Sequence, residues 1–196
     1  SDVAKSYILY RKQREKVRNM KSTILDYKDL VNSYVNATDW RVKENSTVTY
    51  SVGGLILSNS GAITANYWLS EIYDQEIADA HREGDFHIHD LSMLTGYCAG
   101  WSLKQLIQEG LGGIPGKITS KPAKHLASLC NQMVNFLGIM QNEWAGAQAF
   151  SSFDTYLAPF VKVDNLPYDQ VKKCIESFIY GVNTPSRWGT QAPFSN

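Results

Sequence analysis

Cysteine is scarce in this chain, and neither sign of charge is in excess. The three cysteines, Cys98, Cys130 and Cys174, are odd in number and widely spaced, and no CxxC pair occurs. This pattern argues against a disulfide framework and against a zinc knot, and it fits a reducing cytoplasm. With 19 basic and 19 acidic residues the formal net charge is zero, so no broad field attracts nucleic acid or an anionic membrane. Phosphate groups must therefore be bound by local donors.

Long apolar runs are lacking as well. No run approaches the ~18 residues that span a membrane. Together with the zero net charge, this leads us to expect neither a membrane nor a nucleic acid as a partner. What the 196 residues do contain is 43% hydrophobic and 12% aromatic side chains. These shares are typical of a globular protein, and the length is enough for one good core and a prior of one to two domains.

Titratable side chains gather in one stretch, GDFHIHDLSMLTGYCAGWSL (84–103). Side chains at i and i+2 of a strand point to the same face. The HIHD segment is therefore predicted to be a strand that directs His87 and His89 into one cavity. Asp90 follows directly, and Cys98 lies among small residues that let a ligand approach closely. Two imidazoles beside a thiol predict a functional site.

Three other interpretations of the same residues stay open. The histidines are also compatible with hydrogen-bonded core residues of a half-buried strand. HxH followed by Asp resembles the first-strand ligands of barrel metal hydrolases, although only His81 and His125 remain to complete such a site. Cys98 is compatible with an inert, buried thiol.

Helical periodicity dominates most of the remaining sequence. The strongest predicted helix covers 123–141, where an apolar stripe recurs at every third or fourth position. Such a stripe packs either on its own core or on a second copy of the chain. A further helix, capped by Ser60, is predicted to begin near Ala62. Helices with short strands between them predict an α/β fold.

Two polar stretches are candidate ligand sites. The first is a predicted Asn-, Ser- and Gly-rich loop with small donors for a substrate, for which a plain loop is the alternative; its candidates are Asn45, Ser51, Asn59 and Ser60. The second, GLGGIPGK (110–117), has neither Walker nor GxGxxG spacing. With Lys117 and Lys121 it offers backbone N–H groups and ammonium charge to a triphosphate. A flexible surface loop is the alternative there.

Several segments occur along the chain in this order: NSTVTYSVGGLILSNSGAITANYWL (45–69), the 84–103 stretch, NEWAGAQAFSSFDTYLAPFV (142–161) and PSRWGTQAPFSN (185–196). Together they resemble the anaerobic, class III ribonucleoside-triphosphate reductases, a glycyl radical enzyme family. The resemblance covers essentially the whole chain. It implies that 21–196 is the helix-rich N-terminal part of a ten-stranded α/β barrel, and that 1–20 is a linker helix or the tail of an ATP-cone domain.

The resemblance also implies a reaction and roles in it. Members of the family reduce ribonucleoside triphosphates to deoxyribonucleoside triphosphates by thiyl and glycyl radical chemistry, with formate as reductant. Cys98 matches the second active-site thiol, which returns a hydrogen atom to the ribose C2′. His87, His89 and Asp90 match residues that bind substrate hydroxyls or handle protons, for which a neutral imidazole is suited.

Other parts of the family's machinery are expected outside this chain. We expect the radical glycine, the thiyl-forming cysteine and the C-terminal zinc site to follow Asn196, so the chain alone should be inactive. The implied partners are a radical-SAM iron-sulfur activating enzyme, ATP or deoxynucleotide effectors, and a second copy in a homodimer. Lys117, Lys121 and Gln132 are the expected effector contacts beside the dimer interface. A non-catalytic nucleotide-binding or dimerisation module on the same scaffold is the alternative.

Overall fold

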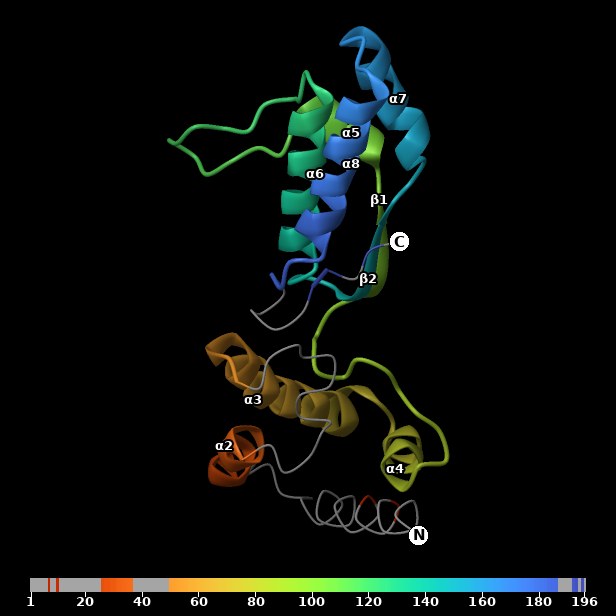
Figure 1. Cartoon of the computed structure of the whole chain (residues 1–196). Coiled ribbons are helices and arrows are strands. Elements are labelled where there is room, and N and C mark those ends of the chain that lie inside the picture. The colour runs from red at the N-terminus through yellow and green to blue at the C-terminus, as the bar shows by residue number, and fades with distance from the viewer. Residues whose placement is uncertain are drawn as a thin grey trace. The chain divides into compact units, whose positions relative to one another are not determined.

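The computed structural model of the chain describes Tyr7, Tyr10 and residues 26–36, 50–186, 192, 193 and 195 (Figure 1). Asn45 and nearly all of the segment 1–20 lie outside the described residues. The described residues up to Leu94 form one compact unit, and those from Thr95 onward form a second.

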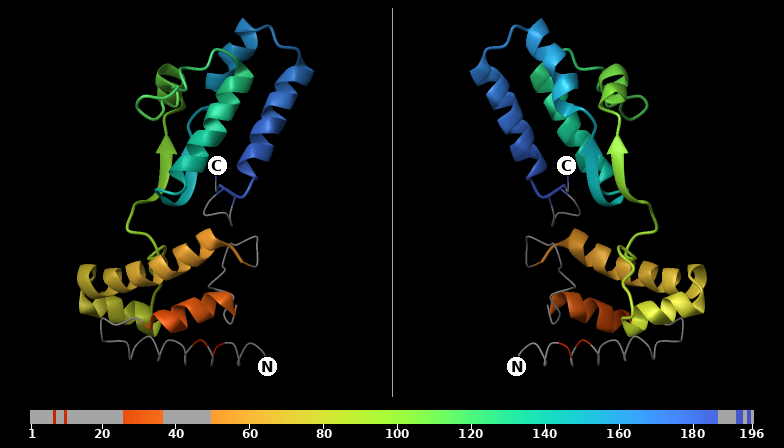
Figure 2. Two further views of the ribbon diagram at one scale, coloured as in Figure 1. Left: turned by 90° about the vertical axis from the view of Figure 1, so that its left-hand side faces the viewer. Right: turned by 90° about the vertical axis from the view of Figure 1, so that its right-hand side faces the viewer.

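The first unit is helical in its described part. Its elements are α2 (Tyr27–Val35), α3 (Val52–Tyr67), the π-helix η2 (Trp68–Ile72) and α4 (Gln75–Glu83). Asp26 starts α2, since its carboxylate accepts from the backbone N–H groups of Lys28 and Asp29 at 2.9 and 3.3 Å. α2 packs along α3, and α3 runs directly into η2 (Figure 2).

The predicted start of a helix near Ala62 is wrong, because α3 already begins at Val52. Ser51, not Ser60, is the capping residue: its Oγ accepts from the N–H of Gly54 at 2.8 Å. The glycines and serines of this segment have low helix propensity, but tertiary packing overrides it. Gly61 shows the reason, since a Cβ there would lie 2.9 Å from the Cβ of Ser92. A small residue lets the helix approach that loop.

The second unit places helices between and after two parallel strands. Its elements are β1 (Tyr97–Trp101), α5 (Leu103–Glu109), α6 (Leu126–Met140), β2 (Ala145–Phe150), α7 (Phe153–Val163) and α8 (Tyr168–Val182). β1 and β2 pair in parallel, with Trp101 opposite Phe150. Parallel neighbours need a crossover connection, which α5 and α6 supply here. This arrangement confirms the α/β prediction, whereas the ten-stranded barrel stays a prediction.

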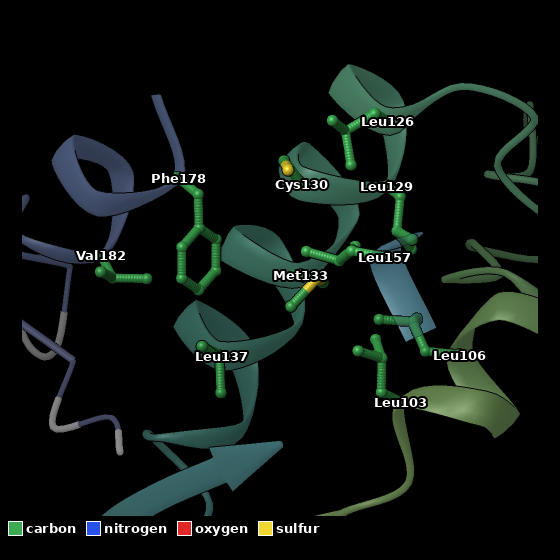
Figure 3. Close-up of a cluster of buried hydrophobic side chains, with 10 residues drawn as sticks. All are labelled: Leu103, Leu106, Leu126, Leu129, Cys130, Met133, Leu137, Leu157, Phe178 and Val182. Atoms are coloured by element: carbon green, nitrogen blue, oxygen red, sulfur yellow. The ribbon is translucent and has the colours of Figure 1, made fainter. Parts of the chain in front are cut away.

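The predicted helix 123–141 is α6, and its apolar stripe faces the core of its own unit (Figure 3). Leu129 and Met133 are 0% exposed there and belong to one buried cluster with Leu157 of α7 and Phe178 of α8. The exposed positions of α6 are mostly small or polar. The stripe therefore stabilises this unit and is not available for contact with a second copy.

Across the described residues, no helix combines the length and the apolar character needed to cross a membrane.

Candidate functional site

A tight reversal brings the HIHD segment back alongside the end of α4. Gly84 ends this helix with φ 89°, a left-handed conformation that favours glycine. The backbone N–H groups of Gly84 and Asp85 both donate to the carbonyl of Ala80, at 2.9 and 3.0 Å. The chain then returns past the last turn of α4, where Nδ1 of His81 accepts from the N–H of Ile88 at 3.1 Å.

The imidazoles of this region form a row. The ring of His87 lies 5.5 Å from that of His81 and 4.8 Å from that of His89, centroid to centroid. The last two rings meet edge to face, at 79°. His87 and His89 are exposed, whereas Ile88 between them is half-buried. The two rings thus lie together, as the HxH spacing predicts.

The predicted strand over HIHD is nevertheless wrong. Residues 87–90 have neither helical nor strand structure. The physical reason is that the N–H of Ile88 donates to a side chain, His81, and not to the carbonyl of a neighbouring strand. In the sequence His81 is a candidate only for the metal hydrolase alternative, so its role as a backbone acceptor was missed. Its place one turn before the Gly84 reversal was the available signal.

The HIHD segment is also held at its other end. Asp90 has φ 54°, and its carbonyl accepts from the N–H of Met93 at 3.4 Å in the turn that follows. Nε1 of Trp68, in η2, donates to the carbonyl of Met93 at 3.1 Å. Ser92 lies against Gly61 of α3. The histidine pair is therefore displayed on a loop anchored to α4, to η2 and to α3.

Cys98 lies in β1 at a point of backbone strain. Its φ is 51°, and the register between β1 and β2 shifts at this residue. Left-handed backbone is costly for a side chain other than glycine and gathers at functional sites. The conformation places Sγ 3.3 Å from the backbone N–H of Ala147, which donates to it. Gly146 has φ 85°, and a Cβ there would lie 2.9 Å from Sγ.

A buried polar contact joins the two strands beyond the thiol. Gln148 is 0% exposed, and its Oε1 accepts from Nε1 of Trp101 at 2.7 Å. The Trp101 ring meets those of Phe136 and Trp144 edge to face, at 5.4 and 5.8 Å. Sequence reasoning missed both residues. Their only signal was a glutamine within the small and aromatic residues of β2.

Cys98 is more exposed than Cys130. All three cysteines are free. Cys130 is 2% exposed, and burial, with a smaller contribution from neighbouring Cys174, raises its pKa to about 11. Cys130 is therefore a neutral thiol near pH 7 that belongs to the core, whereas the Cys98 side chain is half-buried.

Two of the predicted substrate-binding side chains form hydrogen bonds with the backbone of α3. The Ser51 hydroxyl caps the helix. The backbone N–H of Ser51 donates to the hydroxyl of Tyr34, and that hydroxyl donates to the carbonyl of Ser51, both at 3.2 Å. The Ser60 hydroxyl donates to the carbonyl of Leu57 at 3.2 Å. Asn59 differs, since its Oδ1 is buried and accepts no hydrogen bond from the described residues. The predicted loop is thus a helix from Val52 onward.

The glycine-rich segment forms a closed loop that projects from between α5 and α6 (Figure 1). Gly112 and Ser120 close its base with backbone hydrogen bonds of 3.1 and 2.7 Å. Nε2 of Gln132 fixes the base, donating to Oγ of Ser120 at 2.9 Å and to the carbonyl of Lys121 at 2.6 Å. Lys117 and Lys121 are exposed. Gln132 itself is buried, and its Oε1 has no hydrogen-bond partner among the described residues.

The metal hydrolase alternative gains no support. Within the described ranges, no three His, Cys, Asp or Glu side chains are grouped so as to hold a metal ion. Nδ1 of His81 already accepts from a backbone N–H. His125 lies in the second unit and bonds to Asp164 at 3.0 Å.

The family model for the anaerobic ribonucleoside-triphosphate reductase matches residues 44–196. The chain belongs to this family. Curated anaerobic ribonucleoside-triphosphate reductases from Haemophilus influenzae and Escherichia coli are 22% and 23% identical to it. Each alignment covers 98% of this chain and 30% of the relative. The chain therefore spans about 30% of the length of the curated relatives that it matches.

Solved structures of the same family resemble this chain. The anaerobic ribonucleotide reductase from Thermotoga maritima in complex with dATP and CTP has a TM-score of 0.61 at 25% identity, covering 86% of this chain and 31% of its own. The same enzyme with citrate in the active site has a TM-score of 0.63 at 25% identity, with 86% and 33% covered. The predicted family membership is confirmed.

Proposed function

We propose that this chain supplies a hydrogen-donating thiol and a hydroxyl-binding histidine pair to an anaerobic ribonucleoside-triphosphate reductase. The observation that carries the proposal is the geometry of Cys98. A strained φ of 51° is retained in β1, and Sγ is held by the N–H of Ala147 at 3.3 Å. A thiol needed only to fill a core has no use for such strain.

The reaction defines the task of that thiol. The ribose loses its 3′ hydrogen atom to a radical formed outside this chain, after which the 2′-hydroxyl leaves as water once it is protonated. Cys98 then gives the hydrogen atom of its S–H bond to C2′. Formate then returns a hydrogen atom to the thiyl radical left on Cys98 and passes its second electron to the sugar, and it leaves as CO2. An S–H bond suits this step because it is weak enough to yield hydrogen to a carbon radical.

The histidine pair is proposed to handle the ribose hydroxyls. His87 and His89 are exposed neighbours, and a neutral imidazole both donates and accepts. One of the rings is proposed to deliver the proton with which the 2′-hydroxyl leaves. The carboxylate of Asp90 is a further acceptor for a hydroxyl.

Of the substrate-binding candidates, Asn59 is retained because its Oδ1 accepts no hydrogen bond from the described residues. Ser51 and Ser60 serve α3, and Asn45 remains a candidate from the sequence. For the effector we propose the loop of residues 112–120. Its backbone N–H groups, with the exposed side chains of Lys117 and Lys121, suit a triphosphate.

Gln132 enters this effector proposal as an anchor of the loop and as a buried acceptor. The related Thermotoga maritima reductase was solved with dATP and CTP, which supports nucleotide ligands for this chain. We further propose that the protein works as a homodimer in a reducing cytoplasm and that a radical-SAM activating enzyme is its partner. The glycyl radical and the zinc site are proposed to lie outside this chain. The barrel to which β1 and β2 contribute is proposed to have ten strands.

The test is the change of Cys98 to alanine in the full-length reductase, assayed anaerobically with ribonucleoside triphosphate and formate. Cys98→Ala should abolish deoxynucleotide formation and leave nucleotide binding intact. Cys174→Ala is the matched control, because that thiol is also half-buried but lies in α8; it should turn over normally. Ordinary turnover by Cys98→Ala would overturn the proposal. A non-catalytic binding module would bind nucleotide without forming product even in the unaltered protein.

A further inference from the structure

His81 reaches the backbone midway between the two proposed catalytic rings. Its Nδ1 accepts from the N–H of Ile88 at 3.1 Å, and its ring lies 5.5 Å from that of His87, inclined by 42°. The ring of His87 in turn meets that of His89 at 4.8 Å. One side chain thus contacts the histidine pair through both the backbone and a ring.

The hydrogen bond from Ile88 fixes a protonation state as well as a position. A ring nitrogen that accepts from an N–H carries no proton, so the neutral ring of His81 holds its hydrogen on Nε2. The acceptor is needed at this place because residues 87–90 form no strand whose neighbour would bond to the N–H of Ile88. His81 therefore takes the place of a strand carbonyl.

We propose that His81 is a positioning residue for His87 and His89. It fixes the peptide between them through Nδ1, and it sets the orientation of the His87 ring by direct contact. Both exposed rings then present a fixed arrangement of donors and acceptors to ribose hydroxyls. His81 itself is half-buried and needs no contact with substrate. The catalytic consequence rests on the proposed function, whereas the positioning does not.

Substitutions at His81 separate its two contacts. His81→Asn keeps an acceptor close to the position of Nδ1 but removes the ring. His81→Phe keeps a ring against His87 but removes the acceptor. His81→Leu removes both. His125→Asn is the matched control, because His125 also bonds through Nδ1, to Asp164, but lies in the second unit.

The first measurement is NMR of the full chain with ¹⁵N-labelled histidine. The Nδ1 signal of His81 should be that of an unprotonated acceptor. In His81→Phe the amide of Ile88 should exchange at least tenfold faster, and His81→Asn should restore its protection. The ring ¹⁵N chemical shifts of His87 should change in His81→Leu, which removes the ring contact, and stay unchanged in His125→Asn. A proton on Nδ1 of His81, or an unchanged Ile88 exchange rate in His81→Phe, would overturn the proposal.

The second measurement is turnover by the full-length reductase. We expect His81→Leu to lower kcat by tenfold or more with a smaller change in KM, and His81→Asn to recover part of the loss. A purely structural role would instead lower the active fraction and leave kcat per active site unchanged, which would overturn the inference. Cys98→Ala separates the two proposals: activity in that variant refutes the proposed function and leaves the NMR result on His81 standing.

Discussion

Replacing Gly146 by alanine should displace the thiol of Cys98 and destabilise the strand pair. Gly146 has φ 85°, which costs an L-residue roughly 1–2 kcal/mol. The added Cβ would also lie 2.9 Å from Sγ of Cys98 and 2.8 Å from the ring of Tyr97. The thiol must then move away from the N–H of Ala147, which forfeits a hydrogen bond of about 0.5–1.5 kcal/mol. The expected total is about 1.5–3.5 kcal/mol.

Other glycines of the same unit separate these contributions. Gly116 has φ 82° and no atom within 4 Å of an added Cβ, so Gly116→Ala carries only the backbone cost of about 1–2 kcal/mol. Gly100, in β1, has neither a positive φ nor an atom within 4 Å of an added Cβ. Gly100→Ala should be neutral or stabilise by about 0.4–1 kcal/mol, because alanine restricts the unfolded chain.

Amide hydrogen exchange supplies the assay, since the slowest amides of the second unit report its free energy of unfolding. The rate at which iodoacetamide alkylates Cys98, followed by mass spectrometry, reports the position of the thiol. Gly146→Ala should accelerate both exchange of the Ala147 amide and alkylation. A cost no larger than that of Gly116→Ala, together with an unchanged alkylation rate, would refute the reasoning.

Predictions for two further residues test the thiol chemistry and the effector loop. The pKa of Cys130 is raised from 9.0 to about 11, so its thiol contributes stability that is complete below pH 9 and is lost as pH rises through 11. The loss amounts to about 2–3 kcal/mol in urea unfolding, and Cys130→Ala should abolish this pH dependence. Lys121→Ala in the full-length reductase should weaken effector control of substrate choice and leave basal turnover intact. Lys104→Ala, an exposed lysine of α5, is its control in the same nucleotide assay.

Parts of both units could be predicted from the sequence because their signals are local. The apolar stripe of 123–141 repeats with the helical period, and the structure places α6 at Leu126–Met140. Gly84 ends α4 as a glycine in left-handed backbone does. The family resemblance was carried by four segments together, among them the one with HIHD and GYCAGW, since the order of side chains along a chain is itself the signal.

The surroundings of the same residues could not be predicted, because they depend on segments far apart in the chain. The periodicity predicts an apolar stripe on α6 but does not predict which surface covers that stripe. Only the packing of α7 and α8 against it shows that Leu129 belongs to the core. The Gly- and Ser-rich sequence of α3 is typical of a loop. The close packing of Gly61 on Ser92 accounts for the glycine at that position of the helix.

The sequence by itself determined the family, the α/β class and the candidate reactive side chains, because each follows from residue types at short spacing. The tertiary structure decided their conformation. HIHD is a loop because His81 accepts the hydrogen bond that a strand would have taken. The left-handed backbone of Cys98 depends on its pairing with β2, whose Ala147 lies 49 residues further along the chain. Such contacts form only when the chain closes on itself, and no local pattern of side chains specifies which distant group will be the partner.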